Sequence, residues 1–153
     1  MPQVALRQTL RMVAQAAATA VEPWWIISSA AAALHGASVA NVGDVDLLMS
    51  TGDARNLLER LGLPPAAGTA SPLFKSAVFG CWRDPPLPVE IMGGFQVATD
   101  EGWCRVSPAS CQPMLVDGLT VFVPSRQDLV GLLRLFGRPK DLERARLLEK
   151  LPR

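Results

Sequence analysis

The chain has 153 residues, a hydrophobic content of 49% and a formal net charge of +1. This length predicts one domain with a sizeable core, and the nearly neutral charge excludes a chain built for nonspecific nucleic-acid binding. No apolar run reaches the ~18 residues that a membrane span needs. The cysteines have no CxxC spacing and indicate neither a disulfide framework nor a zinc site, so a cytoplasmic protein is expected.

The first half of the chain alternates helix and strand signals. Leucine and valine at helical spacing predict an amphipathic first helix, and a Pro/Gly/Ala/Ser-rich stretch predicts a loop. The predicted elements are a helix over 4–21, a strand over 24–27, a short helix over 29–34, a strand over 42–49, a helix over 53–61 and a loop over 64–72.

The second half adds more strands and then two helices. The predicted elements are a strand over 73–82, a strand over 87–92, an irregular segment over 93–112, a hairpin over 115–123, a helix over 125–136 and a last helix over 139–151. No internal repeat and no second domain boundary are visible. The irregular alternation of strands and helices favours an α/β (α+β) fold, with a mixed sheet flanked by helices.

Asp44 and Asp46 are the most informative residues of the sequence. They lie two apart on an apolar strand, so both side chains face one side while Val45 and Leu47 face the core. Two adjacent carboxylates repel each other and raise at least one pKa. A bound divalent cation removes that repulsion, and carboxylate oxygens are ligands that Mg²⁺ prefers.

A third carboxylate, Glu90, lies on the apolar strand that follows. Val89 and Ile91 share one face of that strand and Glu90 the other. If the two strands are neighbours, three carboxylates converge, and such a cluster can hold two metal ions that clamp the attacking and leaving oxygens of a phosphoryl-type transfer. A salt bridge at the surface is the alternative for Glu90.

Ser28 and Ser29 open the short helix that ends near Gly36. Serine is a preferred N-cap residue, so the two side chains are expected to cap this helix. The free backbone N–H groups at the turn can also bind a phosphate. We therefore expect a phosphate site next to the Asp44 strand.

The order of these features resembles the nucleotidyltransferase superfamily, in which an apolar strand, Gly-Ser or Gly-Gly, a short helix and Asp-x-Asp precede a third acidic residue. The similar segments are ISSAAAALHG, GDVDLLM, PVEIMGG and LLRLFGRPKDLERARLLEKL. The sequence is most similar to small bacterial stand-alone nucleotidyltransferase-like proteins, related to abortive-infection and minimal-nucleotidyltransferase toxins. The resemblance implies one nucleotidyltransferase-like domain over 1–153, with a core at about 22–124 and C-terminal helices at about 125–151.

This resemblance also implies an activity, the Mg²⁺-dependent transfer of a nucleoside monophosphate from an NTP to a hydroxyl acceptor. Asp44, Asp46 and Glu90 would be the catalytic and metal-binding residues, and Ser28 and Ser29 would bind the phosphates of the NTP. The acceptor stays open between a small molecule, a tRNA end and a protein side chain, although the charge of the chain does not indicate a nucleic acid.

The sequence departs from the superfamily pattern at two places before the Asp-x-Asp motif. Ser28 replaces a glycine, whose backbone approaches phosphates closely, and Ala40 and Val42 stand where related proteins often carry Arg and Thr or Ser. Two alternatives therefore remain. One is a catalytically degenerate module that binds a nucleotide, a protein partner or a second copy of itself, and the other is one component of a toxin–antitoxin pair.

The remaining polar and aromatic residues are expected to be structural. His35 is expected to bond backbone carbonyls at a helix end, Lys75 to be exposed to solvent, and Lys140 to belong to a charge network at the start of the last helix together with Arg138 and Asp141. A nucleotide-facing Lys140 is the alternative. The tryptophans, Trp24, Trp25, Trp82 and Trp103, are expected in the core or in pocket walls.

Overall fold

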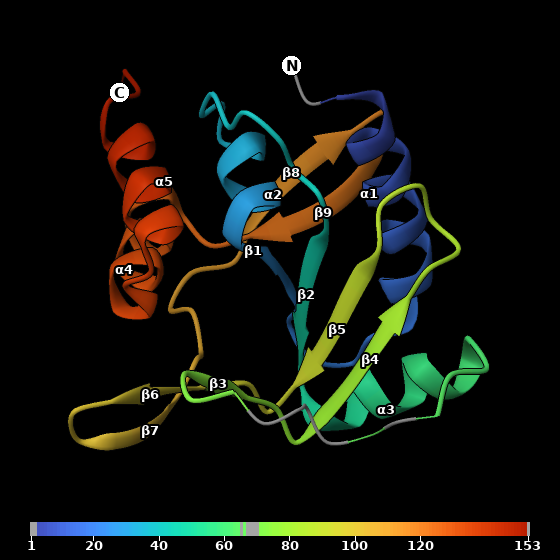
Figure 1. Ribbon diagram of the computed structural model, residues 1–153. Helices are drawn as coiled ribbons and strands as arrows, with labels where there is room; N and C mark the ends of the chain where they lie inside the picture. The colour runs from blue at the N-terminus through green and yellow to red at the C-terminus, as the bar shows by residue number, and fades with distance from the viewer. Residues whose placement is uncertain (1–2, 65, 67–70, 153) are drawn as a thin grey trace.

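The computed structural model describes residues 3–64, 66 and 71–152, and its centre is a mixed four-stranded sheet (Figure 1). Strands β2 (Val45–Met49) and β5 (Val89–Gly93) are parallel, and each outer strand is antiparallel to its neighbour. The order across the sheet is β1 (Trp25–Ile27), β2, β5 and β4 (Val78–Trp82). The mixed sheet predicted from the sequence is confirmed.

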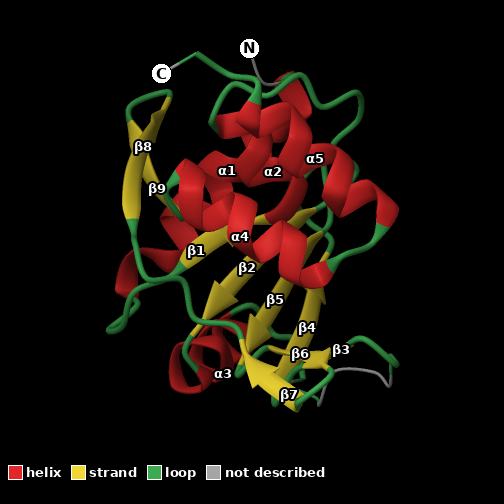
Figure 2. Cartoon of the chain, turned by 90° about the vertical axis from the view of Figure 1, so that its left-hand side faces the viewer, coloured by secondary structure: helices red, strands yellow, loops and turns green. Residues whose placement is uncertain are grey.

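Helices flank this sheet, as predicted. They are α1 (Val4–Ala16), continued by a short 3-10 turn at Ala17–Thr19, then α2 (Ser28–Leu34), α3 (Thr51–Arg60), α4 (Arg126–Phe136) and α5 (Pro139–Glu149). Within the described residues, no helix is both long enough and apolar enough to cross a membrane. Figure 2 shows α2, α4 and α5 gathered at one end of the sheet.

One face of the central sheet carries the main core. Val45 and Leu47 of β2 and Ile91 of β5 are fully buried and pack in one cluster with Leu10 of α1 and Leu57 of α3. These β2 and β5 residues alternate with Asp46 and Glu90 along their strands, so the predicted division of the two faces is confirmed. The carboxylates consequently lie on the face away from α3.

The opposite face is covered by a smaller core and a second sheet. Ile27, Leu48, Met92, Phe95 and Phe136 belong to this smaller core. The second sheet has the order β3 (Phe74–Lys75), β6 (Gln96–Thr99) and β7 (Gly102–Arg105), and a separate hairpin is formed by β8 (Gln112–Val116) and β9 (Leu119–Val123). The smaller core and the second sheet leave room for a pocket beside the carboxylates.

Several of the predicted elements are wrong in part. The segment 93–112 is not irregular, because it contains the β6–β7 hairpin. The predicted strand over 73–82 is two strands, β3 and β4, that pair in different sheets. The first helix ends at Ala16, and Val21 is 85% exposed, because the chain turns so that the N–H groups of Val21 and Glu22 donate to the carboxylate of Asp53.

The C-terminal helices begin and end as the sequence predicts. The Ser125 side chain caps α4 by accepting a hydrogen bond from the N–H of Asp128. Gly137 ends α4 in the left-handed conformation with φ of 72°, and Pro139 begins α5. The predicted loop over 64–72 lies largely outside the described residues.

Candidate functional site

Strands β2 and β5 bring the three predicted carboxylates together. Asp46 lies directly opposite Glu90 in the parallel pair. Asp44 comes just before β2, which begins at Val45 and not at residue 42 as predicted. One oxygen from each carboxylate lies within 4.8 Å of the other two. The predicted convergence of Asp44, Asp46 and Glu90 is confirmed.

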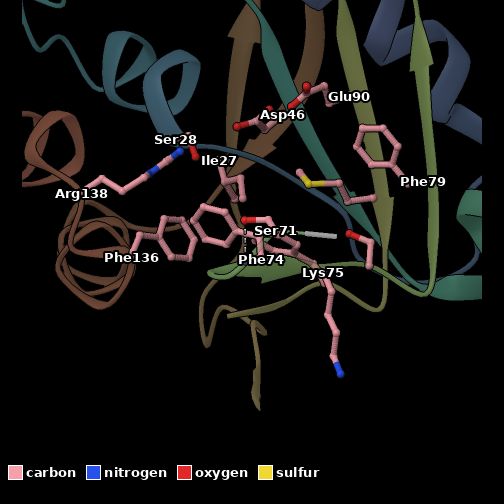
Figure 3. A pocket seen from close by; sticks show the side chains of 13 residues that line it. Ile27, Ser28, Asp46, Ser71, Phe74, Lys75, Phe79, Glu90, Phe136 and Arg138 are labelled. Carbon is pink, nitrogen blue, oxygen red and sulfur yellow. Dashed lines mark hydrogen bonds between the residues drawn. The ribbon is translucent and has the colours of Figure 1, made fainter. Parts of the chain in front are cut away.

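A pocket of about 210 Å³ opens beside this cluster, with Asp46 and Glu90 in its wall (Figure 3). Its remaining walls come from distant parts of the chain. Its other polar residues are Ser28, Ser71, Ser76, Lys75 and Arg138, and its apolar residues are Ile27, Phe74, Phe79, Met92, Phe95 and Phe136. The pocket therefore has two carboxylates in one wall, and its other walls combine apolar residues, four of them phenylalanines, with polar and basic ones.

Burial and mutual repulsion raise the pKa values of two of the three carboxyl groups. Burial raises the pKa of Asp46 well above its ordinary value, and the charges of Asp44 and Glu90 add to the increase, while the Ser28 side chain opposes it. Burial, followed by the charge of Glu90, also raises the pKa of Asp44. The raised pKa values predicted from the sequence are confirmed.

Asp46 also has an unsatisfied oxygen. Its Oδ1 atom is buried and has no hydrogen-bond partner among the described residues. A buried polar atom without a partner is rare and costly in a folded protein. Three clustered carboxylates with one such oxygen form an all-oxygen donor set, so these residues fit Mg²⁺.

The turn at Ser28 has a geometry that the sequence did not predict. Ser28 adopts a left-handed backbone with φ of 59°, and neither Ser28 nor Ser29 caps α2, because the N-cap is Ile27 and makes no side-chain cap bond. The predicted capping is therefore wrong. Ser28 instead lines the pocket and takes the type of torsion that glycine normally supplies.

The two lysines expected near the site differ in their surroundings. Lys75 is exposed, as predicted, and its ammonium group lies 4.4 Å from the centre of the Trp103 ring. Figure 3 shows its side chain pointing away from the carboxylates. Lys140 is also exposed, but its charge partly offsets the rise in the pKa of Asp44.

Arg138 is a pocket residue that the sequence placed only in a charge network. The network is confirmed for Arg138 and Asp141, because Arg138 Nε donates to Asp141 Oδ2 at 2.6 Å and Arg138 Nη2 donates to Oδ1 at 3.0 Å, whereas the second basic partner of Asp141 is Arg144 and not Lys140. The pocket position was missed, as were those of Phe74, Phe95 and Phe136. The only sequence signal was the Phe-Gly-Arg corner between two predicted helices, which does not show what the corner faces.

The histidine and the tryptophans are structural for the most part, as expected. His35 Nε2 lies 2.8 Å from the carbonyl oxygen of Pro124. Trp24 and Trp82 are buried in the main core. Trp103, by contrast, is 44% exposed, and no tryptophan lies among the residues found to line the carboxylate pocket.

No protein-family model and no curated protein sequence matches this chain. The chain is similar in structure to a proposed nucleotidyltransferase from Thermotoga maritima, with a TM-score of 0.73 and 20% sequence identity over 98% of this chain and 94% of the other. It is also similar to the antibiotic-resistance factor ANT(2'')-Ia in solution, with a TM-score of 0.58 and 16% identity over 93% of this chain and 81% of the other. A crystal structure of ANT(2'')-Ia in complex with adenylyl-2''-tobramycin gives a TM-score of 0.57 and 16% identity over 93% and 86% of the two chains. This likeness extends over nearly the whole chain, and it shows that the protein has a nucleotidyltransferase-like fold, a mixed β-sheet flanked by helices.

Proposed function

We propose that this protein is a Mg²⁺-dependent nucleotidyltransferase, which transfers a nucleoside monophosphate from an NTP to a hydroxyl group of an acceptor. The observation that carries the proposal is the cluster of Asp44, Asp46 and Glu90 beside a pocket. The nucleotidyltransferase-like fold supports it, because the cluster lies on adjacent strands of the central sheet. The same residues are the ones that the superfamily pattern marks as metal-binding.

In this proposal the chain acts by positioning its substrates and by lowering charge repulsion. Asp44, Asp46 and Glu90 would hold Mg²⁺, in a one-ion or two-ion site. Bound Mg²⁺ would neutralise phosphate charge and align the attacking and leaving oxygens. The acceptor oxygen bonds to the α-phosphorus, the bond to the pyrophosphate oxygen breaks, and Glu90 takes the hydroxyl proton. Ser28 and the turn around Ser29 would contact the phosphates.

The pocket limits the acceptor that we propose. The crystal structure of ANT(2'')-Ia contains adenylyl-2''-tobramycin. In this chain the carboxylates lining the pocket are Asp46 and Glu90 of the metal cluster, and the other charged lining residues, Lys75 and Arg138, are basic. When Asp46 and Glu90 hold Mg²⁺, the charged side chains left to face an acceptor are basic, and they do not favour a polycationic acceptor. We therefore propose a neutral or anionic acceptor for this protein.

A catalytically degenerate module that binds a nucleotide or a protein partner is the second candidate. The departures at Ala40 and Val42 favoured it from the sequence. Both residues contribute to a different pocket, beside Gly36 and Ala37, and neither is among the residues found to line the carboxylate pocket. This placement reduces their weight as evidence against activity. Membership of the toxin-related group stays a proposal that rests on the sequence resemblance.

Titration with Mg²⁺ and each NTP tests the proposed function through thermal stability and pyrophosphate release. A ligand present at 100 times its Kd should add about 2.7 kcal/mol of stability. Asp46→Asn should lose this Mg²⁺-dependent gain and the release of pyrophosphate, because a metal ligand is gone. Without Mg²⁺, the variant should be at least as stable as the native chain. Burial and the charge of Asp44 raise the pKa of the Asp46 carboxyl group, so its charged form destabilises the folded protein, and the asparagine removes that charge.

The possible results separate the candidates. Stabilisation by Mg²⁺-NTP without turnover of any NTP would favour the binding module. An Asp46→Asn chain that is much less stable than the native chain without Mg²⁺ would make Asp46 a structural residue, and the enzyme proposal would lose its main support.

A further inference from the structure

Arg138 is the pocket cation whose guanidinium is held in place from two sides. Its Nε and Nη2 atoms donate to the two oxygens of Asp141, which is 0% exposed. Its guanidinium carbon lies 4.8 Å from the centre of the Phe74 ring. A planar guanidinium fixed by a bidentate carboxylate and an aromatic face loses little freedom when it binds a ligand.

The remaining edge of this guanidinium is available to a ligand. No hydrogen bond to Arg138 Nη1 occurs within the described residues, although an arginine has five N–H donors. Figure 3 shows the Arg138 side chain extending toward Ser28, on the side of the pocket where Asp46 lies. The open donors therefore lie between the start of α5 and the carboxylate cluster.

The charge around Arg138 favours an anion at this place. Arg138, Lys140 and Arg144 are three basic residues at the N-cap and in the first two turns of α5. The fully buried Asp141 lies within ion-pair distance of both Arg138 and Arg144. Residues 138–144 hold these three basic side chains and two carboxylates, Asp141 and Glu143, and Glu143 pairs with Arg146. The start of α5 therefore carries a net positive charge, opposite a carboxylate face that needs positive charge.

We propose that Arg138 binds the phosphates of the nucleotide, with Asp141 as the residue that positions it. This inference rests on the proposed function, since it concerns the same pocket. Ala40 and Val42 leave no cation just before Asp44, and the structure brings one from α5 instead. Arg138 would thus hold the phosphates from the side opposite to the metal cluster.

Arg138→Gln tests the role through the affinities for Mg²⁺-ATP, adenosine and inorganic tripolyphosphate, measured by calorimetry. Loss of charge-assisted hydrogen bonds should weaken Mg²⁺-ATP and tripolyphosphate binding roughly 10- to 100-fold and leave adenosine binding unchanged. Arg138→Lys keeps the charge but loses the planar fork of donors, so its affinities for Mg²⁺-ATP and tripolyphosphate should lie between those of the native chain and of Arg138→Gln. Arg146→Gln is the control, because Arg146 lies on the same helix, is exposed and pairs with Glu143.

Arg138 also takes part in the cap of α5, so a structural effect must be recognised. A purely structural role would lower the melting temperature and weaken all three ligands together, and that result would overturn the inference. If the Gln variant does not fold, the Lys variant decides, since unchanged affinity for tripolyphosphate and Mg²⁺-ATP in it would also overturn the role.

The inference and the proposed function can fail separately. If the native chain binds Mg²⁺-ATP and Arg138→Gln binds it equally well, the inference about Arg138 is wrong, and the proposed function is unaffected. If tripolyphosphate binding depends on Arg138 but the chain transfers no nucleotide, the inference about Arg138 is supported and the proposed enzymatic activity is wrong. A native chain that binds neither tripolyphosphate nor any NTP overturns the inference.

Discussion

Ser28 holds a strained backbone at the turn between β1 and α2, with φ of 59°. A left-handed conformation costs a residue other than glycine about 1–2 kcal/mol. Such strain persists where the surrounding structure imposes it, and it is concentrated at functional sites. Here the residue lines the carboxylate pocket, and its side chain opposes the rise in the pKa of Asp46. The strain thus lies where the proposed phosphate and metal sites meet.

Ser28→Gly should therefore stabilise the protein. Relief of about 1–2 kcal/mol of left-handed strain outweighs the roughly 0.5–1 kcal/mol of backbone entropy that glycine loses, so the free energy of unfolding should rise by up to about 1.5 kcal/mol. Urea denaturation without Mg²⁺ measures the change. From the sequence alone, the free energy of unfolding is expected to fall, because replacing a serine in an ordinary backbone conformation by glycine destabilises a protein.

Ser29→Gly is the matched control for this prediction. Ser29 is buried in α2 and does not have a positive φ, so its replacement should cost about 0.5–1 kcal/mol. Equal destabilisation by the two substitutions would show that the Ser28 backbone stores no strain. Residue patterns on apolar strands predicted the carboxylate faces, but a single torsion at a turn has no periodic signal and could not be predicted.

At the scale of elements, α3 packs closely against β5, the strand that carries Glu90. A Cβ atom placed on Gly93 would lie 2.9 Å from the Cβ of Ala54, 3.0 Å from the Cα of Thr51 and 3.2 Å from the carbonyl oxygen of Ser50. Backbone atoms of a helix cannot move alone, so any larger residue must displace α3. Gly93 is on the same strand as Glu90 and pairs with Met49 of β2.

Gly93→Ala should lower the free energy of unfolding by roughly 1–3 kcal/mol, the usual cost of overpacking a well-packed contact. Chemical denaturation measures it. Gly52→Ala is the control, because a Cβ on Gly52 meets nothing within 4 Å and alanine favours the helix. It should leave the stability unchanged or raise it. A Gly93→Ala chain of native stability would mean that α3 is loosely packed on β5.

The elements differ in how far the sequence could predict them. The strands of the central sheet carry alternating or continuous apolar residues, and β2 and β5 were predicted within a few residues. The four residues of β7 are all exposed, so they show no alternation, and the β6–β7 hairpin was missed. The residues 73–82 read as one strand because nothing in their sequence shows that Phe74 pairs with Val97 while Phe79 pairs with Met92.

At the scale of the whole molecule, the pocket is assembled from segments far apart in the chain. Ser28 follows β1, Asp46 and Glu90 lie on β2 and β5, and Phe136 and Arg138 come from the corner between α4 and α5. Strand periodicity could predict the two carboxylate faces separately. It could not place the α4–α5 corner beside them, because that contact depends on the packing of helices against the end of the sheet.

A pocket built in this way predicts how ligand binding spreads through the molecule. If Mg²⁺-ATP contacts both the carboxylates and Arg138, any opening of α4 and α5 must break the bound state. Hydrogen exchange that depends on such openings should then slow by up to roughly 100-fold at 100 times Kd. The slowing should appear in β2 and α2 and also in α4 and α5.

Exchange measured by mass spectrometry with and without Mg²⁺-ATP checks this, with the β8–β9 hairpin as the internal reference, because none of the pocket-lining residues comes from it. In Arg138→Gln, the slowing should persist in β2 and weaken in α5, since the carboxylate contacts remain. Slowing restricted to β2 and α2 in the native chain would mean that the helices are not part of the bound site. Equal slowing everywhere, the hairpin included, would mean that exchange occurs only by global unfolding, so that the ligand stabilises the molecule as one unit.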